Sequence, residues 1–125
     1  MRVLLTGGYG CIGTWLAANL LERGDRVFVY DLKQDLHRLR LLLDDHQLQK
    51  VEFVQGDVTD HARLLETVQT CSITHVIHLA GLQVPVCKAD PLLGAKVNVL
   101  GTLAVFEAVR QAAQVQRLVY ASSAA

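Results

Sequence analysis

Short apolar runs alternate along the chain with longer segments that have helical spacing or helix-capping residues. Runs of four or five apolar residues are typical of strands that are buried on both faces of a sheet. Five such strands are predicted, at residues 2–6, 26–30, 51–55, 74–78 and 117–121.

Four helices are predicted between these strands. The first spans residues 12–23 and ends at Gly24, and a leucine-rich segment at 34–43 is expected to form the second. The third begins after Thr59 or Asp60, either of which can cap it. The fourth covers 91–113 after a polar connection at 84–90, and Pro91 suits its first turn. Its predicted sheet-facing residues are Val99, Leu103, Phe106 and Val109.

Regular alternation of strand and helix predicts the α/β class, with a doubly wound, Rossmann-like parallel sheet. Right-handed crossovers place helices on both faces of such a sheet. We expect one domain over residues 1–125 with strand order 3-2-1-4-5. A ligand would then bind at the carboxyl ends of the strands, beside the switch point between the first and fourth strands.

A glycine-rich turn follows the first strand, in the sequence Thr6-Gly-Gly-Tyr-Gly-Cys-Ile-Gly13. Gly7 would make the tight turn, Gly10 would let backbone approach a pyrophosphate, and Gly13 would let the helix pack closely on the strand. Backbone amides at the start of the helix would face the phosphate. A turn can also be rich in glycine for steric reasons alone.

An acidic residue, Asp31, follows the second strand 18 residues after Gly13. The spacing is near the roughly 20 residues that separate the glycine turn from the acidic residue on an adenosine ribose. An Asp at this point can also simply begin a turn. Polar or glycine residues follow the other strands too, and those at the ends of strands 3, 4 and 5 are Asp57, Leu79–Gly81, Ser122 and Ser123.

The composition excludes several classes of function. Equal numbers of basic and acidic residues, 12 of each, give no sign of nucleic-acid or anionic-membrane binding. No apolar run approaches the roughly 20 residues of a membrane helix, and the chain begins with a strand where a signal peptide would stand. Three scattered cysteines favour a reducing, cytoplasmic location.

Metal binding is not predicted. Cys71, His75 and His78 are close in sequence, but positions 75 and 78 point to opposite faces of a strand. Their spacing also fits no common zinc pattern.

The chain resembles the extended short-chain dehydrogenase/reductases, in the NAD-dependent epimerase/dehydratase group. The segments that carry the resemblance occur in family order over the whole chain. They are Thr6–Gly13, Asp31, Gly56-Asp-Val58, His78-Leu-Ala-Gly81, Asn98-Val-Leu-Gly-Thr102 and Val119-Tyr-Ala-Ser-Ser123.

The resemblance implies an NAD site. Backbone amides near Cys11 and Ile12 would hold the pyrophosphate, and Asp31 would bind the adenosine ribose. Tyr9 stands where NADP enzymes often carry a basic residue, which favours NAD over NADP, although Lys33 lies nearby. The other implied cofactor residues are Asp57 and Val58 at the adenine, Leu79, Ala80 and Gly81 near the nicotinamide ribose, and Ser122 and Asn98.

The resemblance also identifies Ser123 as the catalytic serine, which hydrogen-bonds the reacting hydroxyl or carbonyl group. The family's Tyr-x-x-x-Lys pair, which moves the proton, is absent from the 125 residues. The last strands of the sheet and the substrate domain of the family are absent as well. The chain alone is therefore expected to be inactive and to represent part of a longer enzyme, a homodimer when complete.

The predicted function is that of the NAD-binding part of a sugar or nucleotide-sugar epimerase, dehydratase or dehydrogenase. In these oxidoreductases hydride transfer passes through a keto intermediate. Gln83 replaces a lysine that is usual in UDP-galactose epimerases, which leaves room for a sugar-acid or polyol dehydrogenase. The alternative is a non-catalytic dinucleotide-binding or regulatory module.

Overall fold

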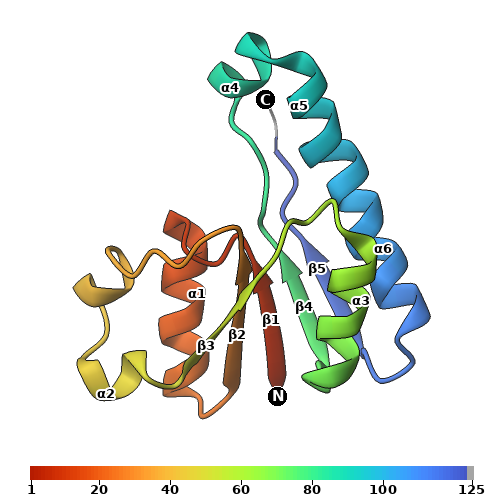
Figure 1. Ribbon diagram of the computed structural model, residues 1–125. Coiled ribbons are helices and arrows are strands. Elements are labelled where there is room, and N and C mark those ends of the chain that lie inside the picture. The colour runs from red at the N-terminus through yellow and green to blue at the C-terminus, as the bar shows by residue number, and fades with distance from the viewer. Residues whose placement is uncertain (124–125) are drawn as a thin grey trace.

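A five-stranded parallel sheet forms the centre of the computed structural model, which describes residues 1–123 (Figure 1). The predicted strand order, 3-2-1-4-5, is confirmed. Across the sheet the strands are β3 (Val51–Gln55), β2 (Arg26–Asp31), β1 (Arg2–Thr6), β4 (His75–His78) and β5 (Arg117–Tyr120).

The register of the strands aligns their carboxyl ends along one edge of the sheet. Thr6, the last residue of β1, pairs with Tyr30 of β2 and with His78 of β4. At the edge of the sheet, His78 pairs with Tyr120 of the edge strand β5. The turns that follow β1, β2 and β4 therefore leave the sheet side by side.

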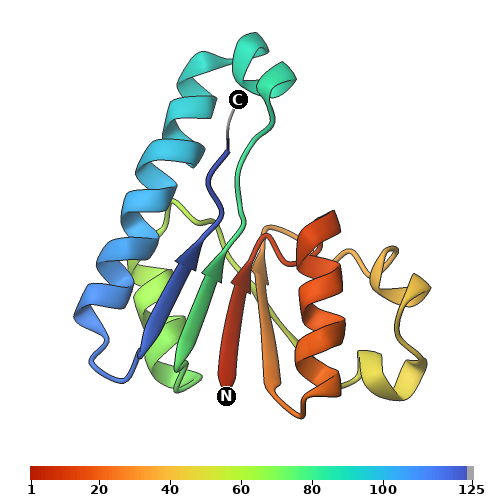
Figure 2. The same cartoon turned by 180° about the vertical axis from the view of Figure 1, so that it is seen from behind.

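Helices cover both faces, as predicted. α1 (Cys11–Glu22) packs on one face, and α3 (His61–Thr70) and α6 (Thr102–Gln111) pack on the other (Figures 1 and 2). A hydrophobic core lies on each face of the sheet. Successive side chains of β1 point alternately into the two cores, because side chains alternate across a strand. Leu4 joins the core beneath α3 and α6, whereas Val3 and Leu5 join the core beneath α1.

Two predicted helix boundaries follow from local chemistry. Gly24 ends α1 with a φ of 81°, and its amide donates to the Leu21 carbonyl at 2.9 Å. At the start of α3, Asp60 is the cap, because its carboxylate accepts a hydrogen bond from the Arg63 amide at 3.0 Å.

The predicted helix at 34–43 is wrong. This segment forms only the short 3-10 turn η1 (Leu39–Leu41), and the four-residue helix α2 (Asp45–Leu48) follows with Asp44 as its cap. Leu39 is fully buried while Leu41 is 74% exposed. Leu39 therefore reaches the core from a single turn, without a continuous helix over this segment.

The predicted long helix exists, but its buried face differs from the prediction. It runs through α5 (Pro91–Ala95), the π-helical segment η2 (Lys96–Gly101) and α6. The predicted connection at 84–90 contains another short helix, α4 (Val84–Ala89). Together α4 and α5 rise beyond the carboxyl edge of the sheet (Figure 1).

Of the four residues that the periodicity selected, Val109 packs against the core, and the fully buried positions of this helix are taken by the smaller residues Val105 and Ala108. Val105 and Ala108 are each 1% exposed, whereas Leu103 is 59% exposed and Phe106 is 44% exposed. Both stripes have helical spacing, so periodicity alone cannot distinguish them. Gly101 decides between the stripes, because a Cβ there would lie 2.9 Å from Val58 Cγ2.

The expectation that no segment is long and apolar enough for a membrane helix also needs correction. The helical stretch Pro91–Gln111 has a mean hydropathy of 1.5 and is long and apolar enough to cross a membrane by length and composition alone. Core helices of soluble proteins, which are mostly buried, pass the same test, whereas here 22% of the window is buried, with Val105 and Ala108 packed on the sheet.

Substitutions on the two faces of α6 test this packing. Val105→Ala should lower the free energy of unfolding by about 2 kcal/mol, because it removes buried methyl groups and leaves a cavity. Leu103→Ala should change it by only about 0.5 kcal/mol. Urea unfolding of both variants measures the difference, and a larger loss for Leu103→Ala would contradict the assigned face.

Candidate functional site

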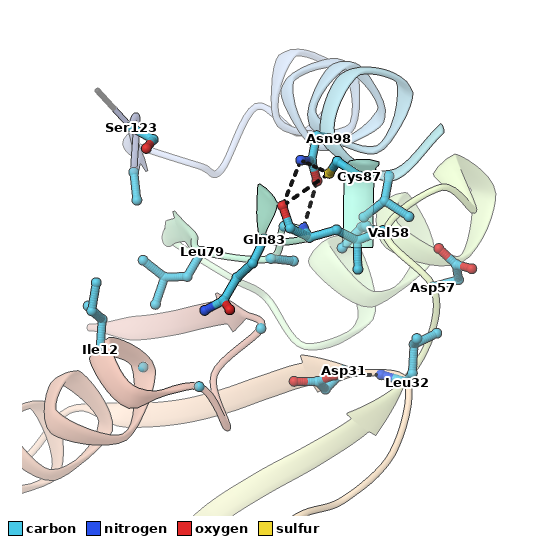
Figure 3. Close-up of a pocket in the computed structure, with 18 of the residues that line it drawn as sticks. Ile12, Asp31, Leu32, Asp57, Val58, Leu79, Gln83, Cys87, Asn98 and Ser123 are labelled. Atoms are coloured by element: carbon cyan, nitrogen blue, oxygen red, sulfur yellow. Dashed lines mark hydrogen bonds between the residues drawn. The ribbon is translucent and has the colours of Figure 1, made fainter. Parts of the chain in front are cut away.

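A cleft of about 1110 Å³ opens at the carboxyl edge of the sheet, between the turns after β1 and β2 and the segment after β4 (Figure 3). All the predicted cofactor residues line it except Ser122, and the predicted catalytic residue Ser123 lines it as well. Those on the wall are Gly7, Gly10, Cys11, Ile12, Gly13, Asp31, Asp57, Val58, Leu79, Ala80, Gly81 and Asn98. Ala124 and Ala125 lie outside the described residues.

The glycine turn after β1 is shaped by backbone contacts. Gly7 has a φ of 68°, which L side chains rarely adopt, and a Cβ there would lie 2.8 Å from the Ala80 backbone. The role predicted for Gly13 needs correction. A Cβ on Gly13 would meet the backbone of Gly8 at about 2.5 Å, so Gly13 allows the helix to pack on the turn itself.

The start of α1 has the properties of an anion site. Gly10 caps the helix without a side chain, and its first turn carries no acidic residue. The first amides of an α-helix have no partner within the helix, and they lie at the positive end of its dipole. The amides of Cys11, Ile12 and Gly13 occupy this position on the cleft wall, where a phosphate would fit.

Asp31 lies at the end of β2, on another side of the same cleft (Figure 3). Its Oδ1 atom accepts a hydrogen bond from the Leu32 amide at 2.9 Å. Burial raises the pKa of Asp31, while hydrogen bonds from the Leu32 and Tyr9 amides act in the opposite direction. Leu32 itself lines the cleft and was not predicted, although its place directly after the strand could have indicated it.

The turn after β3 is held by two hydrogen bonds to Asp57. Asp57 Oδ1 accepts from the Thr59 amide at 2.8 Å and from the Thr59 hydroxyl at 2.8 Å. The buried Tyr30 donates its hydroxyl to the Asp57 carbonyl at 3.0 Å. Asp57 consequently has a fixed position, on the same side of the cleft as Leu32 (Figure 3).

Asn98, in the π-helical segment, holds the segment that follows β4. Its Oδ1 accepts from the Leu82 amide at 2.7 Å, and its Nδ2 donates to the Leu82 carbonyl at 2.9 Å (Figure 3). Leu82 and Cys87, the other residues bonded to Asn98, also line the cleft and were not predicted.

Tyr9 does not contribute its side chain to the cleft. It is 5% exposed, and its ring packs beside Phe53 with 5.8 Å between centroids. Lys33 is absent from the cleft wall, but Lys88 and Gln83 are on it. Among residues 1–123, no three His, Cys, Asp or Glu side chains group as a metal site.

His78 connects the sheet to the helix behind the cleft. The ring is fully buried, with Nδ1 2.6 Å from Thr6 Oγ1 and Nε2 3.1 Å from Thr102 Oγ1. Burial lowers the pKa of His78 below its ordinary value of 6.5. The folded chain therefore holds this imidazole in its neutral form.

The pH dependence of stability follows from this shift. Between the ordinary pKa of 6.5 and the lower pKa of the folded state, the unfolded chain binds the proton and the folded chain does not. The free energy of unfolding should therefore fall as the pH drops below about 6.5, with the full contribution of His78 present above it.

Urea unfolding at a series of pH values measures this effect. His78→Asn should remove part of the slope, whereas His46→Asn, at an exposed position, should leave it unchanged. Equal slopes in the wild type and His78→Asn would contradict the shift.

A glycine turn, an uncapped helix start and an acidic residue at the next strand end, on a sheet of this order, define a Rossmann-type dinucleotide-binding domain. Residues 4–125 match the family described as GDP-mannose 4,6 dehydratase. The chain belongs to this family, which confirms the predicted membership of the epimerase/dehydratase group.

Relatives of the chain include epimerases and a dehydrogenase. UDP-glucose 4-epimerase of Klebsiella pneumoniae is 37% identical over 126 residues, which cover 99% of this chain and 90% of that sequence. D-erythronate dehydrogenase of Cupriavidus necator is 35% identical over 132 residues, which cover 100% of this chain and 39% of that sequence.

A solved structure with a similar fold is that of UDP-glucose 4-epimerase from Thermus thermophilus in complex with NAD. Its TM-score is 0.81 at 37% identity, over 98% of this chain and 38% of that one. The chain spans 37% of the length of the Erwinia amylovora UDP-glucose 4-epimerase, which it also matches.

Proposed function

We propose that the chain binds NAD in this cleft and is the cofactor-binding part of an epimerase, dehydratase or dehydrogenase that acts on a sugar or a nucleotide sugar. The observation that carries the proposal is the pairing of an uncapped helix start with Asp31 across one cleft. The similar fold of an epimerase in complex with NAD supports it.

The pyrophosphate would lie at the amides of Cys11 and Ile12, because these are the exposed donors at the positive end of α1. The carboxylate of Asp31 would accept hydrogen bonds from both hydroxyls of the adenosine ribose, and its charge would repel a 2′-phosphate. The adenine would lie between Asp57 and Val58 on the same side of the cleft as Leu32.

The nicotinamide end would extend toward Leu79, Ala80 and Gly81. Ser123 lies on the opposite side of the cleft from Asp57, which supports its proposed contact with the reacting hydroxyl or carbonyl group (Figure 3). When bound, NAD would accept a hydride from a substrate carbon and so generate a keto intermediate.

The 125 residues are proposed to bind the cofactor without turnover. Proton transfer in this chemistry needs a positioned acid–base group, and the sequence has no Tyr-x-x-x-Lys. Tyr9 and Tyr30 are buried in the two cores, and their burial raises the pKa of each to about 12. Neither is suited to exchange protons with a substrate near neutral pH.

Titration calorimetry with NAD and with NADP tests the binding proposal. Asp31→Ala should weaken NAD binding by about 10- to 100-fold, because it removes charge-assisted hydrogen bonds to the ribose. The preference for NAD over NADP should fall at the same time, since the charge that repels a 2′-phosphate is gone.

Asp45→Ala is the matched control for the Asp31 variant. It removes an exposed carboxylate at the start of α2, away from the cleft, and should leave NAD binding unchanged. Equal affinities for NAD in the wild type and Asp31→Ala, with both chains folded, would rule out the proposed ribose contact.

A cytoplasmic, homodimeric protein is proposed for the complete enzyme. Cys11, Cys71 and Cys87 are free thiols, as expected in a reducing compartment. An apolar stripe on the outer side of η2 and α6 supports self-association, and its members are Val99, Leu100, Leu103 and Phe106.

Sedimentation at increasing protein concentration tests this surface. Leu103→Gln should lower the apparent association constant by about tenfold, because it places a polar amide in the apolar stripe. Leu41→Gln, at another exposed leucine outside the stripe, should have no effect. A chain that stays monomeric at every concentration would argue against the dimer surface.

A further inference from the structure

We propose that His78 is a positioning residue that holds both ends of the segment Leu79–Leu82, the floor of the cleft, through a one-directional chain of hydrogen bonds from Thr6 to Asn98. The part of this inference that concerns affinity rests on the proposed NAD site. The arrangement of the hydrogen bonds does not.

The direction of the chain is set at Thr102. Its hydroxyl donates to the Asn98 carbonyl at 2.8 Å, as threonine hydroxyls commonly do toward the preceding helical turn. A hydroxyl has one proton, so toward His78 Nε2, 3.1 Å away, Thr102 Oγ1 can only accept. The proton of the neutral imidazole is therefore on Nε2.

The other ring nitrogen must then be an acceptor. Thr6 Oγ1 lies 2.6 Å from Nδ1, so the Thr6 hydroxyl donates to it. Thr6 Oγ1 is left to accept from the Ala80 amide at 3.4 Å and from the Leu79 amide at 3.3 Å, and the Leu79 amide also donates to the Thr6 carbonyl at 3.1 Å. One orientation of every proton satisfies the whole chain, and burial, which lowers the pKa of His78, keeps the ring neutral.

This chain reaches the cleft floor at two places. At the first end, Thr6 faces the amides of Leu79 and Ala80. At the other end, Thr102 fixes the backbone of Asn98, whose side chain holds both the amide and the carbonyl of Leu82. All four floor residues line the cleft, so their positions depend on a buried ring that does not itself touch the cleft.

The floor has little freedom to adjust. Ala80 lies so close to the glycine turn that a Cβ on Gly7 would be 2.8 Å from its backbone. A displacement of the floor would therefore press on the turn that leads into the proposed pyrophosphate site. The ring of Tyr120 stacks on His78 with 5.7 Å between centroids, which limits rotation of the imidazole.

The first measurement is the pair of ring ¹⁵N shifts of His78 in the full chain, assigned by their absence from His78→Asn. We expect Nδ1 to be unprotonated and Nε2 to be protonated. A ring protonated at Nδ1, or at both nitrogens at neutral pH, would overturn the proposal. This result does not depend on any ligand.

The second measurement compares Thr102→Val with Thr102→Ser. Valine keeps the shape of the side chain and removes the hydroxyl, so amide exchange at Leu79, Ala80 and Leu82 should accelerate and the Kd for NAD should rise about tenfold. Serine restores the hydroxyl and should return both to within about twofold of wild type.

Thr67→Val is the matched control. Thr67 is a buried helical threonine whose hydroxyl donates to the Arg63 carbonyl at 2.8 Å, outside the cleft. It should destabilise the fold without changing exchange at the floor or NAD affinity. Equal effects of Thr102→Val and Thr67→Val on floor exchange would reduce the role of His78 to packing and overturn the proposal.

The outcomes separate this inference from the proposed function. A wild-type chain that fails to bind NAD, but shows the expected ring shifts and the expected exchange in both Thr102 variants, refutes the cofactor proposal and keeps the positioning role. If Thr102→Val does not fold, the ring ¹⁵N shifts of His78 and the amide exchange rates of Thr102→Ser decide. Exchange rates in Thr102→Ser that equal those of the wild type support the proposed hydrogen bonds, and faster exchange counts against them.

Discussion

Gly7 brings the turn after β1 against the backbone of Ala80, and the two strands that flank the switch point are joined at that contact. A Cβ at Gly7 would lie 2.8 Å from Ala80, so no other residue fits without moving the segment after β4. The positive φ of Gly7 then directs the chain toward Gly10 and the start of α1. The anion site and the cleft floor therefore share one backbone contact.

A second constraint is polar and buried. Inside an apolar sheet, an unpaired hydrogen-bonding group costs about 1–3 kcal/mol, whereas a fully paired network fixes one arrangement. His78 bonds to both Thr6 and Thr102, and the network ends on backbone groups of residues around the cleft. The geometry of the cleft thus depends on residues that a ligand would not contact.

The sequence predicted the strands and their order because buried parallel strands are apolar runs and their connections have one hand. Asp31 and the glycine turn could be placed because they follow strand ends directly. The face of α6 could not, because two apolar stripes have the same spacing and the close approach of Gly101 to Val58 selects one of them. The partner of Asn98 is Leu82, 16 residues earlier, and no local pattern indicates such a pair.

The position of β1 at the centre of the sheet has a consequence for folding. β1 meets β2 across a separation of 24 residues, but Thr6 meets His78 across 72. Pairings distant in sequence close large loops and tend to form slowly. The half-sheet of β1, β2 and β3 contains only one wall of the cleft. A nascent or partly unfolded chain would therefore hold the glycine turn and Asp31 without a complete crevice, so that any ligand of the crevice favours the fully folded chain over every partial one.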